Sequence, residues 1–177
     1  MEKVIYLRDL QSDDAESLYT LCLDEGLRRS GISYYDSVDD ALSAISIWNS
    51  VLDNSIICKA IIETATNKMI GIIIFADMNR YQGYYELEYA LLLESRNKGY
   101  ATQAVHYMIE FAFKKYNAEV VAAWVRSHNQ ASIRVLEKCG FIFEGRLRKH
   151  ARDRSDTMCY SITLDDWLKQ FPQRNKR

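Results

Sequence analysis

Residues 84–113, YYELEYALLLESRNKGYATQAVHYMIEFAF, constrain the fold of this chain more than any other stretch. The alternation of polar and apolar side chains in YYELEYAL predicts a β-strand, whereas the apolar spacing of three and four in ATQAVHYMIEFAF predicts an amphipathic helix. The junction between them, ESRNKGYAT, places Arg96, Lys98 and Gly99 at the helix start. Any fold containing this segment must therefore direct a strand into a helix N-terminus through a short basic loop.

The rest of the chain predicts an α/β class fold, an α+β mixed sheet with helices on its faces, in the order β-α-α-β-β-β-α-β-α-β-β. Only seven glycines and one proline occur, and no linker or repeat interrupts the 177 residues, so a single domain over 1–177 is expected. Ser12 is the expected N-cap of the first helix, residues 26–37 are expected to form a loop, and 118–126 a buried strand. The expected strands are 4–10, 55–64, 68–78, 84–93, 118–126, 141–150 and 157–164; the expected helices are 11–26, 37–54, 99–116 and 129–140.

Charge and composition exclude several classes of partner. The formal charge is −1, from 23 basic and 24 acidic side chains, so no broad attraction to nucleic acid or to an anionic membrane is expected. No apolar run is long enough to span a membrane and no signal peptide is recognisable, which predicts a soluble cytoplasmic protein. The cysteines are far apart and no histidine lies at zinc-ligand spacing, so reduced thiols and no metal are expected: Cys22, Cys58, Cys139 and Cys159.

The loop before the 99–116 helix has the chemistry of a phosphate site. A helix start offers backbone N–H groups without an intrahelical partner and the positive end of the macrodipole. Gly99 can adopt positive φ and has no Cβ to block a ligand, while Arg96 and Lys98 add mobile positive charge. The pattern therefore suits a diphosphate, although a solvated basic turn before a helix is the alternative. It is neither a dinucleotide-binding GxGxxG loop nor a phosphate-binding loop ending in GK[ST].

Two segments in order, RNKGYATQAV and VRSHNQASIRVLEKCGFIFEG, resemble the GCN5-related N-acetyltransferase (GNAT) superfamily. The similarity extends through LRDLQSDDAESLYTL and CKAIIETATNKMIGIIIF and covers nearly the whole chain. The closing stretch, EGRLRKHARDRSDTMCYSITLDDW, looks most like the RimJ/RimL-type branch, which acetylates protein N-termini and small amines. The resemblance implies a GNAT-like acyl-CoA N-acyltransferase fold, acetyl-CoA as co-substrate, and a bulge that splays strand 84–93 from strand 118–126.

The resemblance also assigns cofactor contacts. The backbone of the loop would bind the pyrophosphate, the strand end would hydrogen-bond the pantetheine arm, and one asparagine would contact the cofactor. The corresponding residues are Arg96, Asn97, Lys98, Gly99, Tyr100, Ala101 and Thr102 for the pyrophosphate; Leu91, Leu92 and Leu93 for the pantetheine; and Asn129.

Two carboxylates and a hydroxyl are the candidate catalytic groups. Glu86 and Glu88 are two apart on the expected strand, so their side chains share one face, and either could accept the amine proton directly or through water. Glu88 stands where the resembled family usually has glycine. The resemblance gives Ser132 the role of protonating the thiolate of coenzyme A. The alternative is that both carboxylates are ordinary solvent-facing charges.

The acceptor is an amine whose identity the sequence leaves open. Tyr34, Tyr35 and Asp36 could line its pocket, with Asp36 attracting a cation; equally, this could be a solvated loop whose aromatic side chains pack inward. The leading expectation is an N-acetyltransferase acting on a protein N-terminal α-amine or a small amine. The alternatives are a polyamine or antibiotic-amine acetyltransferase and a non-catalytic acyl-CoA-binding module. A homodimer through the C-terminal strands and the DDWLKQF helix is a further expectation.

Overall fold

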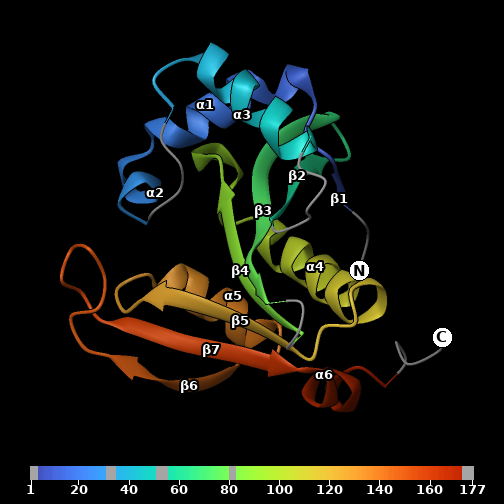
Figure 1. Ribbon diagram of the computed structural model, residues 1–177, viewed down its shortest axis with the longest axis vertical. Helices are drawn as coiled ribbons and strands as arrows, with labels where there is room; N and C mark the ends of the chain where they lie inside the picture. Colours follow the sequence, from blue (N-terminus) through green and yellow to red (C-terminus); the bar gives the residue numbers. More distant parts are fainter. Residues whose placement is uncertain (1–3, 31–34, 51–55, 80–82, 173–177) are drawn as a thin grey trace. The chain divides into compact units, whose positions relative to one another are not determined.

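A computed structural model describes residues 4–30, 35–50, 56–79 and 83–172 (Figure 1). Seven strands form a mixed sheet in the hydrogen-bonded order β1-β2-β3-β4-β5-β7-β6, which confirms the predicted fold class. The strands are β1 (Ile5–Arg8), β2 (Ile57–Glu63), β3 (Lys68–Asn79), β4 (Tyr84–Leu91), β5 (Val120–Arg126), β6 (Ile142–Leu147) and β7 (Thr157–Thr163). The helices are η1 (Ser12–Asp14), α1 (Ala15–Leu23), α2 (Glu25–Ser30), α3 (Val38–Ser50), η2 (Leu93–Ser95), α4 (Tyr100–Lys115), α5 (Gln130–Lys138) and α6 (Leu164–Gln170), the η helices being 3₁₀.

The chain forms two compact units, one of residues 1–76 with 88–104 and one of residues 77–87 with 105–177. In the first unit, β1, β2 and β3 pair antiparallel, and the predicted hairpin between β2 and β3 is confirmed. Its turn carries Asn67 at φ 55°, a left-handed conformation that asparagine tolerates. A buried core joins α1 and α3 to β2, β3 and the end of β4: Leu10, Ala15, Leu18, Leu21, Cys22, Tyr35, Ala41, Ile45, Ala60, Ile62, Met69, Ile72, Ala90 and Leu92.

Two local predictions in this unit are wrong. A short helix, α2, covers Glu25–Ser30, so residues 26–30 of the segment 26–37, which was expected to be a loop, are helical. The first helix is not capped by Ser12: a 3₁₀ turn begins there, and the carboxylate of Asp14 accepts from the N–H of Gln11 at 2.8 Å and from both terminal nitrogens of Arg8. The buried carboxylate of Asp14 therefore holds the start of α1 in place, because both Arg8 and the backbone of Gln11 donate hydrogen bonds to it.

In the second unit, the start of β4 pairs parallel with β5, and β7 pairs antiparallel with both β5 and β6. In Figure 1, β5, β7 and β6 run side by side. Helix α5 covers one face of these strands, where Ile133 and Leu136 are buried and Glu137 accepts from the hydroxyl of Tyr160 at 3.4 Å. Helix α6 begins at a capping box between Thr163 and Asp166.

The predicted strand 118–126 is observed as β5 and is buried along most of its length, with Trp124 as the exception. Trp124 in β5 is 48% exposed, although Ala122 and Val125 beside it are buried. In β7, Cys159 pairs with Trp124 and the next residue, Tyr160, contacts α5. Because successive side chains of a strand point to opposite faces, Trp124 lies on the face opposite α5.

Among the described residues, none of the helices combines the length and the apolar composition that a membrane crossing requires. All four cysteines are free thiols, of which Cys22 and Cys139 are buried and Cys58 and Cys159 are half-buried. Burial raises the pKa of the Cys58 thiol to about 12, so this side chain stays protonated near neutral pH.

Candidate active site

The basic loop between β4 and α4 has open space beside Gly99. After η2, Asn97 and Gly99 adopt positive φ, at 62° and 81°, and α4 begins at Tyr100. A Cβ added at Gly99 would meet nothing within 4 Å. The N–H of Gln103 donates to the carbonyl oxygen of Gly99 at 3.2 Å, in the first turn of α4. The space beside Gly99 is thus open at the start of a helix, as an anion site requires.

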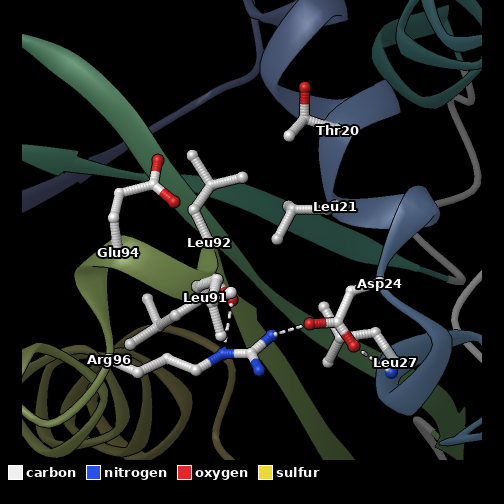
Figure 2. Close-up of a pocket in the computed structure, with 9 residues that line it drawn as sticks. Thr20, Leu21, Asp24, Leu27, Leu91, Leu92, Glu94 and Arg96 are labelled. Carbon is white, nitrogen blue, oxygen red and sulfur yellow. Dashed lines mark hydrogen bonds and ion pairs between the residues drawn. The ribbon is translucent and has the colours of Figure 1, made fainter.

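The guanidinium of Arg96 is not a mobile charge. Its Nε donates to the carbonyl oxygen of Leu91 at 3.1 Å, and its Nη2 donates to Oδ2 of Asp24 at 2.7 Å (Figure 2). Asp24 ends α1, and its other oxygen accepts from the N–H of Leu27 at 3.0 Å. Arg96 therefore ties the loop to the corner between α1 and α2, whereas the exposed side chain of Lys98 extends from the loop.

The charge of Asp24 is stabilised at this corner. Partial burial acts to raise its pKa, but the hydrogen bonds from Leu27 and Arg96 and the charge of Arg96 outweigh it, and the pKa lies below its ordinary value. The carboxylate is consequently ionised throughout the neutral range. It can serve as a permanent partner for the guanidinium.

A second contact holds the first residue of α4. The hydroxyl of Tyr100 donates to Oε1 of Glu63, at the end of β2, at 2.5 Å. This hydrogen bond, with a further one from Thr66, lowers the pKa of Glu63, and the bond to Glu63 raises the pKa of Tyr100. The ammonium of Lys98 lies 6.0 Å from the centroid of the Tyr100 ring. The helix start is thereby fixed to the β2–β3 hairpin.

A cavity of about 310 Å³ lies beside the Arg96–Asp24 ion pair (Figure 2). Its walls are mostly leucine side chains from the end of α1, from α2 and from the end of β4: Thr20, Leu21, Asp24, Leu27, Leu91, Leu92, Leu93, Glu94 and Arg96. The N–H of Leu92 already donates to the carbonyl of Ile70 at 2.9 Å, so Leu92 can offer a ligand its side chain or carbonyl but not its N–H. The cavity is therefore an apolar recess next to the basic loop.

The two candidate bases lie in β4, two residues apart. Glu86 is half-buried and pairs in register with Ala122 of β5, and its negative charge contributes, after burial, to raising the pKa of the Cys159 thiol. Glu88 is exposed. Both remain predicted bases.

Asn129 and Ser132 lie together at the start of α5. Asn129 is the N-cap, and its Oδ1 accepts from the N–H of Ser132 at 3.1 Å. Since the cap uses the carbonyl oxygen, the amide nitrogen is the part of this side chain that can donate to a ligand. Ser132 is half-buried in the first turn of the helix.

The structure describes two of the three predicted acceptor residues, Tyr35 and Asp36. Tyr35 is 8% exposed within the core of the first unit, with its ring 6.5 Å from and nearly perpendicular to that of Trp48, as the inward-packing alternative expected. Asp36 is exposed just before α3. Tyr34 lies outside the described residues.

The structure adds two residues that sequence reasoning missed, Asp24 and Glu63. Asp24 is 72 residues from its partner Arg96, and Glu63 is 37 residues from Tyr100. Neither has a local sequence signal, because both act through contacts that only the folded chain creates. Across the described ranges, no three His, Cys, Asp or Glu side chains gather in a way that could hold a metal ion.

Comparison of the sequence with known families finds a match to the acetyltransferase (GNAT) domain over residues 5–142. YoaA of Bacillus subtilis, named as an uncharacterized N-acetyltransferase, is 28% identical over 89% of this chain and 92% of its own length. The spermidine N(1)-acetyltransferase of Vibrio cholerae is 22% identical over 83% of this chain and 84% of its own.

Solved structures share the fold. The crystal structure of a probable acetyltransferase superimposes with a TM-score of 0.83 and 25% identity over 94% of this chain and 96% of that one. The Vibrio cholerae spermidine N-acetyltransferase in complex with CoA and spermine gives a TM-score of 0.83 at 19% identity, over 94% and 99% of the two chains. A dodecameric structure of that enzyme gives 0.77 at 20% identity, over 96% and 99%.

Proposed function

Because this chain belongs to the GNAT acetyltransferase family and is an acetyl-CoA-dependent N-acetyltransferase, we propose that it transfers the acetyl group directly to the primary amine of a small acceptor. Family membership favours an enzyme over a non-catalytic acyl-CoA-binding module. The observation that carries the proposal is the open helix start at Gly99, which has room and backbone donors for the diphosphate of coenzyme A.

Acetyl-CoA fits the first unit as follows. The backbone from Arg96 to Thr102 binds the pyrophosphate, with Lys98 adding positive charge. The pantetheine arm follows the end of β4 at Leu91 and Leu93, and the leucine-lined cavity beside it excludes water from the apolar part of the arm. The amide nitrogen of Asn129 is a further proposed contact.

The chemistry requires a neutral amine. Its nitrogen attacks the thioester carbonyl carbon, the C–S bond breaks, and coenzyme A leaves as a thiolate. Glu86 or Glu88, directly or through a water molecule, accepts the proton that the amine loses, and the hydroxyl of Ser132 or a water molecule protonates the thiolate. An α-amino group has a pKa of roughly 7.7–8.0 and an alkyl ammonium about 10.4, so a small alkyl amine depends more strongly on the base.

A small amine is favoured as the acceptor because the Vibrio cholerae relatives act on, or bind, polyamines. A protein N-terminus, and with it the RimJ/RimL-type branch, is the second candidate, supported by the C-terminal sequence alone. We treat residues 1–177 as one functional domain. We also propose that the chain forms a homodimer. The dodecameric Vibrio cholerae enzyme supports self-association of this fold, but not a particular number of subunits.

The test has two steps. Titration with acetyl-CoA should raise the thermal midpoint in proportion to RT ln(1 + [L]/Kd), and no shift at millimolar acetyl-CoA would overturn the proposal. Thiol release from acetyl-CoA is then measured with spermidine, aminoglycosides and N-terminal peptides. Turnover of peptides but not of spermidine would replace the small-amine acceptor with a protein N-terminus.

A further inference from the structure

An exposed tryptophan lies on the sheet face that α5 leaves uncovered. Trp124 of β5 pairs with Cys159 of β7, and Glu86 pairs with Ala122 two residues before Trp124. Side chains of paired residues share a face, so Glu86, Trp124 and Cys159 project to the same side of the sheet. An indole 48% exposed in the middle of a strand has a large apolar face available to a ligand.

The indole ring is held in place from one edge. His150, in the turn between β6 and β7, makes an edge contact with it at 5.4 Å between ring centroids. The Nδ1 of His150 lies 3.2 Å from the hydroxyl of Thr157. The nearby cation, Arg126, is paired with Asp153 at 3.4 Å, which offsets its charge. His150 thus borders one edge of the Trp124 ring.

Two carboxylates lie on β4 and β6, the strands on either side of the β5–β7 pair. Glu86 stands on β4, and Glu144, at the irregularity in the β6–β7 register, accepts from the hydroxyl of Ser161. Ala122 and Ser161 are paired between them and are small. Strands are spaced about 4.8 Å apart, so β4 and β6, three spacings apart in strand order, lie about 14 Å apart at the backbone. This face therefore offers an aromatic ring and two carboxylates to a protonated amine.

We propose that Trp124 is a cation subsite for the acceptor, and that the acceptor is a small diamine whose second, protonated nitrogen lies against the indole face between Glu86 and Glu144. The inference rests on the proposed function. The reacting nitrogen must be neutral, so any positive charge recognised by the aromatic face belongs to a different nitrogen of the same acceptor. Monoamines lack this group and bind through the reacting end alone.

The experiment compares 1,4-diaminobutane with n-butylamine, which has the same carbon chain and one nitrogen, in the thiol-release assay. The wild-type chain is expected to use the diamine with a kcat/KM at least tenfold higher. Trp124→Ala should raise the KM for the diamine about 2- to 30-fold, the range of an aromatic–cation contact, with the KM for n-butylamine unchanged. Trp124→Phe should retain most of the preference, and Glu144→Gln should weaken it several-fold.

Phe143→Ala is the matched control, because Phe143 is also 48% exposed but contacts the ring of Tyr160 on the opposite face. It should leave the diamine preference unchanged. Equal use of both amines by the wild-type chain, or an equal effect of Trp124→Ala on both, would overturn the inference while the acetyltransferase stands. If no amine is acetylated, calorimetric titration of the CoA-saturated protein with 1,4-diaminobutane decides: binding that Trp124→Ala abolishes supports the subsite, and absence of binding overturns it.

Discussion

Replacing Gly99 with leucine tests whether the start of α4 binds the diphosphate. The backbone φ of +81° costs an L-residue about 1–2 kcal/mol, and a Cβ at this position meets nothing within 4 Å, so the fold should survive with a modest loss of stability. The larger side chain would occupy the space in front of the first-turn N–H groups. Losing two charge-assisted hydrogen bonds of about 1.5 kcal/mol each raises the Kd for acetyl-CoA roughly 100-fold or more.

Isothermal titration with acetyl-CoA measures this effect, and a thermal melt without ligand measures the strain. Gly145→Ala is the matched control: a Cβ there also meets nothing within 4 Å, but its φ lies outside the left-handed region. That variant should keep both affinity and stability. An unchanged Kd in Gly99→Leu, together with an intact fold, would show that the diphosphate binds elsewhere.

Three further predictions concern the carboxylates and the Arg96 tether. Glu86→Gln and Glu88→Gln should each leave acetyl-CoA affinity unchanged, and at least one should lower kcat tenfold or more in the thiol-release assay; two fully active variants would remove both as bases. Asp24→Asn should cost about 1 kcal/mol of unfolding free energy at pH 7, because a depressed pKa stabilises the fold above the ordinary value of 3.8. This difference should shrink in urea melts as the pH falls below 3.8 and through the lowered pKa, and a difference that does not shrink with falling pH would contradict the ionic role. Arg96→Lys should weaken acetyl-CoA binding despite the conserved charge, since an ammonium cannot reproduce the planar fork to Leu91 and Asp24; wild-type affinity would mean that charge alone matters.

Much of the fold could be predicted because its signals are local. The alternation in YYELEYAL and the 3.6-residue spacing after Tyr100 depend only on which face of each element is buried. The strand–loop–helix junction could be predicted from the change between these two apolar spacings and from Gly99 between them. Its chemistry, a helix start with small residues, is likewise a property of the local backbone.

The rest depends on contacts between segments that are distant in sequence. The side chain of Arg96 was expected to serve a phosphate, yet it is bound to Asp24 at the end of α1. Tyr35 was an equally good candidate for a pocket or for the core, and only packing against Trp48 distinguishes the two. The apolar run VVAAWVR predicted a buried strand, but burial on each face depends on what covers it, and the face of Trp124 is not covered by α5.

Taken together, these contacts explain why two conspicuous side chains of the basic loop need not touch the ligand. Arg96 anchors one side of the loop to α1, and Tyr100 anchors the other side to Glu63 on β2. A loop held on both sides loses little conformational entropy when an anion binds, so its backbone donors contribute nearly their full free energy to affinity. The two cations of the loop thus differ in role: Arg96 is paired with Asp24 and holds the loop in place, whereas Lys98 is exposed. Affinity for the diphosphate should accordingly follow the geometry of the backbone more closely than the number of positive charges.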